Sequence, residues 1–304
     1  IDSTNFPTDM YLLQGIQTYS GHSFDLREVD TSNYEVAEQS IKAELKQGDV
    51  GLLVLSHVAF KSGYRYNLAR INELAENYGA EVLWDLSHSA GAVNLNLADS
   101  NTKFAVGCTY KYLNGGPGSP AFLYVRSDQQ NSITSPIWGW FGHKAPFEFE
   151  HEFTPQQSIR KFLVGTPSIL SLTALQPSLD LFSRISMDEV THKSKLLSNY
   201  FIDLVEEKLS VYEYGVASPK DPTKRGSHVV ITHKNAWQIC QALIAKHVGG
   251  VSIVPDFRKP NFIRFGFAPL YNTFEEIEIA IEQLKLIVRD DLFEKFPATH
   301  TEVT

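Results

Sequence analysis

Short apolar runs alternate with segments of helical spacing along the first 125 residues. The apolar runs are rich in Val, Leu, Phe and Ala, which is typical of buried strands. Between the first two, apolar side chains recur at helical spacing and stop at Gly79, which predicts a helix over 68–79 with a glycine at its C-terminal end. Strands are predicted at 49–56, 80–85, 102–109 and 120–125. Strands separated by helices indicate βαβ units, so we predict an α/β fold with a mainly parallel sheet flanked by helices.

The pattern of apolar residues changes from about Ile169 onward. A helix is predicted over 168–182, with Pro177 as a kink, and a long amphipathic helix over 187–209. Further strands are predicted at 227–233, 251–255 and 262–269, and further helices at 235–247 and 273–289. We therefore divide the chain into a large domain over 1–175 and a smaller C-terminal α+β domain over 176–304.

Composition narrows the class of protein. Of 304 residues, 43% are hydrophobic, which is ample for a packed core, and the net charge of −8 argues against a general nucleic-acid binder. No uninterrupted apolar segment reaches the roughly 18 residues that a membrane span requires, and no signal peptide is visible. Cys108 falls in a predicted strand and Cys240 in a predicted helix, which favours buried free thiols over a disulfide. We expect a soluble cytoplasmic protein that contacts neither membrane nor nucleic acid.

Polar side chains gather where the predicted strands end. Ser56, Asp85 and Lys111 all follow apolar runs, and ligands bind at the carboxyl ends of strands in parallel sheets. Lys111 also precedes the glycine-rich stretch NGGPG, which allows close backbone approach to a ligand. Most lysines lie on the surface. A lysine that is partly desolvated in a pocket, however, loses proton affinity and becomes a competent Schiff-base nucleophile.

Asp85 and His88 each allow two interpretations. Asp85 fits a helix N-cap, the commoner role by itself, and it also fits a carboxylate that pairs with a ligand cation. His88, three residues later, fits a half-buried structural histidine or a side chain facing the same site. No G-x-G-x-x-G follows a strand, and neither a Walker pattern nor H-E-x-x-H is present, so dinucleotide, P-loop and metal sites lack support.

Seven motifs along the chain match those of a known enzyme family. Asp85-x-x-His88 followed by Thr109-Tyr110-Lys111 resembles the fold-type I pyridoxal-phosphate enzymes of the class V aminotransferase-like group. Within that group the chain resembles the kynureninases over nearly its whole length, with the motifs in family order. The motifs are NFPTD (5–9), WDLSHSAGAV (84–93), AVGCTYKYLNGGPGSPAF (105–122), GWFGH (139–143), FLVGTPSILSL (162–172), RGSHV (225–229) and RFGFAPLYN (264–272).

The resemblance implies roles for the matching residues. Lys111 would hold pyridoxal 5′-phosphate as a Schiff base, Asp85 would pair with its pyridine nitrogen, and Arg264 would bind the substrate α-carboxylate. Tyr110 would contact the phosphate and lie near the reacting carbon. The other positions implied to bind the cofactor, or to reach phosphate or substrate, are Phe6, Thr8, Asp9, Ser56, His88, Trp140 and Thr166.

The implied reaction is the hydrolytic cleavage of the Cβ–Cγ bond of L-kynurenine to anthranilate and L-alanine, a step of tryptophan catabolism and NAD biosynthesis. Lys111 would act as general base once its amine is released. The resemblance also implies a homodimer with shared active sites, to which the partner subunit would supply Trp140 and Thr166. Thr166 stands where family members that favour 3-hydroxykynurenine carry asparagine, so we expect kynurenine to be preferred, with 3-hydroxykynurenine left open.

Three alternatives remain. A cysteine desulfurase or selenocysteine lyase would need a nucleophilic cysteine on a mobile loop, which neither Cys108 nor Cys240 provides. A class V aminotransferase would not explain GWFGH together with GTP. Family members carry a substantial segment before NFPTD, so we expect this chain to be a truncated or partial form. A non-catalytic truncated homologue is therefore the alternative from another class, although every catalytic position that can be checked holds the expected residue.

Overall fold

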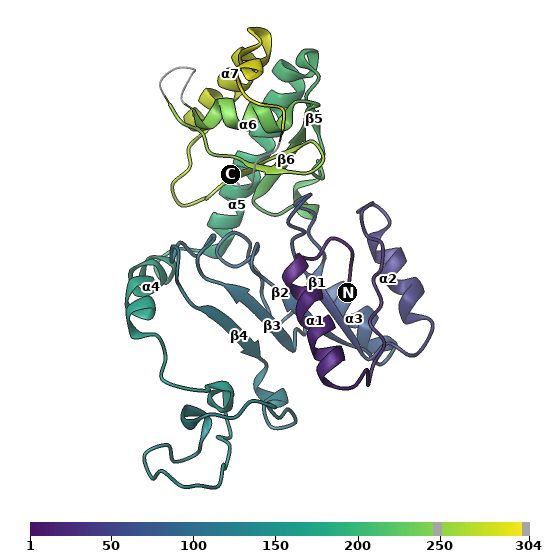
Figure 1. The fold of residues 1–304 in the computed structure, drawn as a ribbon, viewed down its shortest axis with the longest axis vertical. Coiled ribbons are helices and arrows are strands. Elements are labelled where there is room, and N and C mark those ends of the chain that lie inside the picture. Colours follow the sequence, from purple (N-terminus) through teal and green to yellow (C-terminus); the bar gives the residue numbers. More distant parts are fainter. Residues whose placement is uncertain (246–250, 300–304) are drawn as a thin grey trace.

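Two four-stranded sheets organise the chain, one in each of two lobes (Figure 1). The computed structural model describes residues 1–245 and 251–299. In Figure 1 the lobe built on β1–β4 lies below and the lobe built on β5–β8 lies above. None of the helices in these described stretches is long and apolar enough to cross a membrane.

The first sheet has the order β1-β2-β3-β4. Its strands are β1 (Leu52–Ser56), β2 (Glu81–Asp85), β3 (Phe104–Cys108) and β4 (Ala121–Val125). The first three are parallel and β4 pairs antiparallel with β3, so all four strands predicted in this region are confirmed in a mixed, mostly parallel sheet. The helix predicted between β1 and β2 is α3 (Leu68–Asn77), which Asn67 caps by accepting a hydrogen bond from the Arg70 amide at 3.1 Å.

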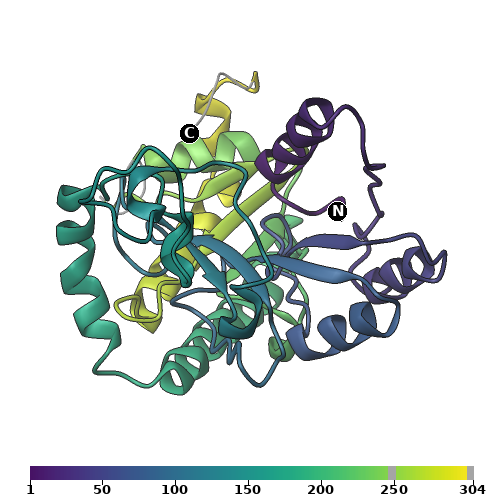
Figure 2. The same ribbon diagram turned by 90° about the horizontal axis from the view of Figure 1, so that it is seen from below.

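Helices lie on both faces of this sheet, but only those on one face bury apolar side chains. α2 (Ala37–Leu45) and α3 bury apolar side chains against one face, including Ile41 and Ile71, around the fully buried Trp84. α1 (Pro7–Tyr19) lies on the other side of the strands and has no buried residue (Figure 2). Neither α1 nor α2 was predicted from the sequence pattern.

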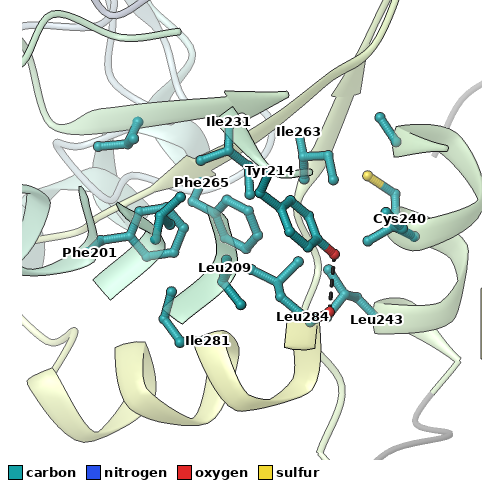
Figure 3. Close-up of a cluster of buried hydrophobic side chains, with 14 of the residues drawn as sticks. Phe201, Leu209, Tyr214, Ile231, Cys240, Leu243, Ile263, Phe265, Ile281 and Leu284 are labelled. Atoms are coloured by element: carbon teal, nitrogen blue, oxygen red, sulfur yellow. Dashed lines mark hydrogen bonds between the residues drawn. The ribbon is translucent and has the colours of Figure 1, made fainter. Parts of the chain in front are cut away.

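The second sheet is antiparallel, with the order β5-β6-β8-β7. Its strands are β5 (Gly215–Val216), β6 (His228–Thr232), β7 (Asp256–Arg258) and β8 (Phe262–Gly266). It packs against α5 (Met187–Leu204), α6 (Ala236–Ile244) and α7 (Phe274–Arg289). Figure 3 shows the resulting core, in which the Tyr214 hydroxyl donates to the Leu284 carbonyl at 3.1 Å.

One predicted strand is wrong. Residues 251–255 form no strand, and the strand of this region is β7, which begins at Asp256. The Ile253 amide donates to the Leu243 carbonyl and the Ser252 hydroxyl donates to the Ile244 carbonyl, at 3.1 and 2.9 Å. The segment is therefore held to the C-terminal end of α6, whose unpaired carbonyls need donors, and not to a strand.

Two helix boundaries also differ. α5 ends at Leu204, and the expected helix continues to residue 209 as a single π-helical turn, Val205–Leu209. α6 ends at Ile244, and the last two residues of the helix predicted over 235–247 lie outside the described residues. Residue 175 lies within α4 (Ile169–Phe182), which contains Pro177, so the domain boundary stays a prediction.

The remaining helical turns are short. They are the 3₁₀ turns Ser127–Gln129, Trp140–Gly142, Ile159–Phe162, Ser210–Tyr212, Pro222–Lys224 and Leu292–Lys295. The second and third belong to a long segment without strands between β4 and α4, which extends away from both sheets at the bottom of Figure 1.

The loop between β1 and α3 joins the two lobes. The Arg65 amide donates to the Lys224 carbonyl at 2.9 Å, and the Gly226 amide donates to the Gly63 carbonyl at 2.9 Å. Gly63 has a φ of +75°, and a Cβ there would lie 2.8 Å from the His228 carbonyl oxygen. Only glycine fits this close approach without strain, so the loop fixes β6 against the first lobe.

Candidate active site

A cavity of about 640 Å³ lies where the two lobes meet. Both sheets contribute to its walls, because the loop after β3 faces the ends of β6, β7 and β8. Its polar or aromatic lining comprises Phe6, His88, Tyr110, Lys111, Tyr112, Asn114, His228, Asp256, Arg258, Arg264, Tyr271 and Asn272. Five of the predicted site residues, Phe6, His88, Tyr110, Lys111 and Arg264, are thus brought to one cavity.

The Lys111 loop has a defined shape. The Asn114 amide donates to the Lys111 carbonyl and the Gly115 amide to the Thr109 carbonyl, both at 2.9 Å. Beneath the loop lies Gly91, at a φ of +87°, where a Cβ would stand 2.6 Å from the Tyr112 carbonyl carbon and oxygen. The sequence GCTYKYLNGG therefore turns sharply after β3 while resting on a glycine, which places Lys111 at the cavity.

Lys111 is half-buried and its charge is poorly compensated. Within the described parts of the chain no group accepts a hydrogen bond from its ammonium, and its nearest recorded partner is the Tyr110 ring, 5.5 Å from Nζ to the ring centroid. Burial lowers the pKa of Lys111, and Arg264 lowers it further, while Cys108, Asp85 and Asp9 act in the opposite direction. The shift enlarges the neutral, nucleophilic fraction of the amine.

Asp85 and His88 follow from the end of β2. Asp85 is buried, is opposite Ser56 in the register of β1 and β2, and accepts the Ser87 amide through Oδ1 at 2.8 Å. That hydrogen bond has the geometry of a turn and leaves Oδ2 for another partner. His88 is buried, and burial holds its pKa well below the usual value, so the ring is neutral at the cavity wall.

The N-terminal motif is fastened to the end of β1. The Ser56 hydroxyl donates to Asn5 Oδ1 at 2.6 Å, and Asn5 Nδ2 donates to the Val54 carbonyl at 3.0 Å. Ser56 is therefore already engaged in positioning Asn5 and, next to it, Phe6. The Phe6 ring lies 5.3 Å from the Phe60 ring, in an edge-to-face arrangement, at the cavity wall.

Thr8 and Asp9 lie in the first turn of α1. Thr8 is exposed. Asp9 is partly buried, and its Oδ2 is a buried oxygen that has no hydrogen-bond partner in the described parts of the chain. Burial, together with repulsion from Asp85 and Asp2, raises the pKa of Asp9 to about 6, although Lys111 acts in the opposite direction. The interaction with Lys111 indicates that α1 faces the lysine loop.

Arg264 is held by groups from both lobes. Its Nε donates to Asp256 Oδ2 at 3.0 Å, and its second terminal nitrogen bonds the same oxygen. Its first terminal nitrogen donates to the Phe60 carbonyl at 2.8 Å. Asp256 Oδ1 also lies 3.5 Å from a terminal nitrogen of Arg258, so a single carboxylate forms ion pairs with two guanidinium groups at this wall. The cavity keeps an excess of positive charge, which suits an anionic ligand.

Trp140 and Thr166 lie elsewhere. Trp140 is part of the long segment before α4, where its ring stacks near Phe149 and lines a separate hollow with His143 and Phe153. Thr166 is exposed just before α4. Neither lines the Lys111 cavity, so this chain by itself does not bring them to the other predicted residues.

Several cavity residues were not singled out in the sequence. His228 lies in RGSHV, Asn114 in the glycine-rich motif, and Tyr271 and Asn272 in RFGFAPLYN, so the motifs contained them without distinguishing them from their neighbours. The Tyr112 hydroxyl donates to the Ser227 carbonyl at 2.9 Å, which ties the lysine loop to the second lobe. No sequence feature marked Asp256 as a site residue, because its region was predicted to be a strand that ends at residue 255.

Known structures share this architecture. The apo cysteine desulfurase of Thermococcus onnurineus NA1 matches 95% of this chain and 72% of its own with a TM-score of 0.78, at 17% identity. A mutant of C-DES with glycine covalently linked to its PLP cofactor matches 93% of this chain and 73% of its own, with a TM-score of 0.78 at 18% identity. The chain therefore has the fold of the fold-type I pyridoxal-phosphate enzymes.

Sequence comparison narrows the likeness further than the fold does. The kynureninase C-terminal domain family matches residues 190–284. Kynureninase of Pseudomonas fluorescens is 38% identical over 93% of this chain and 65% of its own length, and that of Burkholderia mallei is 36% identical over 94% and 66%. Within the fold class, this chain is similar in sequence to the kynureninases. It spans about two thirds of the length of the curated relatives it matches, 65% and 66%.

Proposed function

We propose that the chain is the catalytic part of a kynureninase, which uses pyridoxal 5′-phosphate to hydrolyse L-kynurenine to anthranilate and L-alanine. The observation that carries the proposal is the half-buried Lys111 amine, unpaired among the described residues, in a cavity that also holds His88 and Arg264. The similarity to curated kynureninases supports this assignment of substrate.

The residues fit the cofactor. Lys111 has no hydrogen-bond acceptor among the described residues, Asp9 Oδ2 is buried without a partner, and Asp85 has a free carboxylate oxygen. Lys111 would hold the aldehyde carbon, Asp85 would accept from the pyridine nitrogen, and the exposed Phe6 side chain at the cavity wall would contact the ring. When bound, the cofactor supplies an electron sink for a carbon next to the substrate amine.

The protein's own groups then supply orientation and proton transfer. Arg264 binds the substrate carboxylate with the donors that Asp256 and Phe60 leave free. Lys111 would take a proton from the substrate carbon, because burial lowers the pKa of its amine and so enlarges the fraction that can act as a base. The Tyr110 ring centroid lies 5.5 Å from Lys111 Nζ, and the Tyr110 hydroxyl would return a proton to the alanine fragment. Water is the second substrate of the hydrolysis.

The two cysteines argue against a desulfurase. Cys108 is buried at the end of β3, where its Sγ lies 3.7 Å from the Ser87 carbonyl. Cys240 is buried in α6, and burial raises the pKa of its thiol to about 12. A sulfur nucleophile needs an exposed thiolate, which neither residue offers.

We also propose that two chains assemble so that Trp140 and Thr166 of one reach the cavity of the other. The reason is their distance in the fold from the Lys111 cavity of their own chain, together with the exposed apolar side chains of the segment that bears them. Trp138 is 64% exposed and Phe149 71% exposed. Exposed aromatic groups of this kind mark interaction surfaces.

One experiment tests the function. The purified chain is mixed with pyridoxal phosphate and L-kynurenine, the visible absorbance of the lysine-bound cofactor is recorded, and anthranilate is followed by fluorescence. Lys111→Ala should abolish both signals. Lys103→Ala is the control, since Lys103 precedes the opposite end of β3 and is paired with Glu81 at 2.7 Å. A visible band that survives in Lys111→Ala, or wild-type protein that binds the cofactor without releasing anthranilate, contradicts the proposal.

A further inference from the structure

His228 is the most deeply buried polar side chain of the cavity wall. It is the first residue of β6, it is 1% exposed, and it lines the cavity together with Lys111 and Arg264. Its ring centroid lies 5.5 Å from that of His88, at an angle of 58°. No motif reasoning gave His228 a role.

Both ring nitrogens of His228 lack a hydrogen-bond partner among the described residues. Burial lowers the pKa of His228 to about 3, and Arg264 and Lys111 lower it further, while the backbone of Ala59, which faces the ring, acts in the opposite direction. The ring is therefore neutral and has one N–H donor and one lone pair, of which the Ala59 carbonyl can meet only the donor. Leaving such groups buried and unpaired is costly for the folded protein.

Packing alone does not require a histidine here. The backbone of His228 pairs with Gly266 of β8, and its carbonyl is the atom that Gly63 approaches, so the strand is held by main-chain contacts. An apolar side chain of similar size would fill the same space without an unpaired nitrogen. His233, just after the same strand, is different, because its Nδ1 accepts the Asn235 amide at 3.0 Å.

We propose that His228 is a ligand-binding residue of this cavity, whose neutral ring forms a hydrogen bond with the amino-acid substrate beside the Arg264 clamp. The proposal rests on the proposed function and adds to it a substrate contact from β6. Arg264 neutralises the substrate carboxylate, and His228 forms a hydrogen bond with an uncharged N–H, O–H or carbonyl group of the substrate next to that carboxylate. The ligand thereby satisfies a group that the protein leaves unpaired.

Two substitutions separate binding from structure. His228→Leu keeps the volume and removes both polar atoms, and His228→Gln keeps a neutral donor and acceptor. His233→Leu is the matched control, a buried histidine whose ring already has a partner. Each variant is loaded with pyridoxal phosphate, the visible band confirms loading, and KM and kcat are measured with L-kynurenine. Melting temperatures of the cofactor-free proteins are measured alongside.

We expect His228→Leu to raise KM about tenfold, the effect of one lost buried hydrogen bond, with a much smaller change in kcat. His228→Gln should restore most of the affinity, and His233→Leu should leave KM unchanged. Cofactor-free His228→Leu should melt at the same or a higher temperature, because an unpaired buried group is removed, whereas His233→Leu should melt lower.

Other outcomes overturn the proposal. An unchanged KM in His228→Leu, or a melting temperature that falls as it does in His233→Leu, would mean that His228 is structural. A wild-type chain that binds the cofactor but does not convert L-kynurenine refutes the proposed function instead. The melting comparison still decides in that case whether the protein is more stable without the unpaired ring.

Discussion

Replacing Gly91 by alanine should disrupt the lysine loop from below. Gly91 is buried at a φ of +87°, and an added Cβ would lie 2.6 Å from the Tyr112 carbonyl carbon and oxygen and 2.7 Å from the Leu113 amide nitrogen. All three are backbone atoms, so no side-chain rotation relieves the contact. The peptide after Lys111 must move, or Gly91 must retreat into the packed chain beneath it.

The expected cost has two parts. A residue with a Cβ in the left-handed region costs about 1–2 kcal/mol, and forcing an extra methyl group into a filled space costs about 1–3 kcal/mol more. Gly91→Ala should therefore lower the free energy of unfolding by about 2–5 kcal/mol. Gly79→Ala isolates the first part, because Gly79 has a φ of +76° and nothing within 4 Å of the added Cβ.

The assay is denaturant unfolding of both variants, with uptake of pyridoxal phosphate as a second measurement. We expect Gly91→Ala to lose clearly more stability than Gly79→Ala and to bind the cofactor poorly, because Lys111 is displaced. Gly79→Ala should bind the cofactor normally. Equal losses of stability in the two variants would refute the close-approach argument. Normal cofactor uptake by Gly91→Ala would refute the claim that this glycine places Lys111.

Three further predictions concern charge and specificity. Because the folded pKa of Asp9 is raised from 3.8 to about 6, the stability this group contributes is present below pH 4 and is lost as the pH rises through 6. The melting temperature of cofactor-free Asp9→Asn should therefore exceed that of the wild type by a margin that grows from pH 5 to pH 8, and a constant margin contradicts the shift. Asp256→Asn removes the carboxylate that competes for Arg264, so KM for L-kynurenine should fall severalfold, and a rise would show that Asp256 mainly orients the guanidinium. With threonine at 166, kcat/KM should be higher for L-kynurenine than for its 3-hydroxy derivative, and the opposite preference refutes the reasoning from that residue.

The sequence pattern located much of the first lobe and the centre of the site. Apolar runs bounded by polar residues placed β1–β4 and put Asp85 and Lys111 at strand ends, because a buried parallel strand needs continuous apolar side chains and its carboxyl end opens to ligands. The pattern failed at 251–255. That β-branched run is typical of a strand. Its hydrogen-bond donors, however, bond to the last carbonyls of α6, a contact that the spacing of apolar residues does not reveal.

The amino-acid sequence by itself determined which residues follow the strands, the lysine after β3 and the aspartate after β2, and it carries the motifs shared with the kynureninases. Only the tertiary structure decided which residues meet. Arg264 is bound by Phe60 of the other lobe, and His228 reaches the cavity because Gly63 lets β6 approach the first lobe. These contacts join residues far apart in the chain, and their energies depend on burial and distance, which no local pattern encodes. For the same reason the burial of the His228 ring beside the cavity depends on how the second sheet packs against the first lobe.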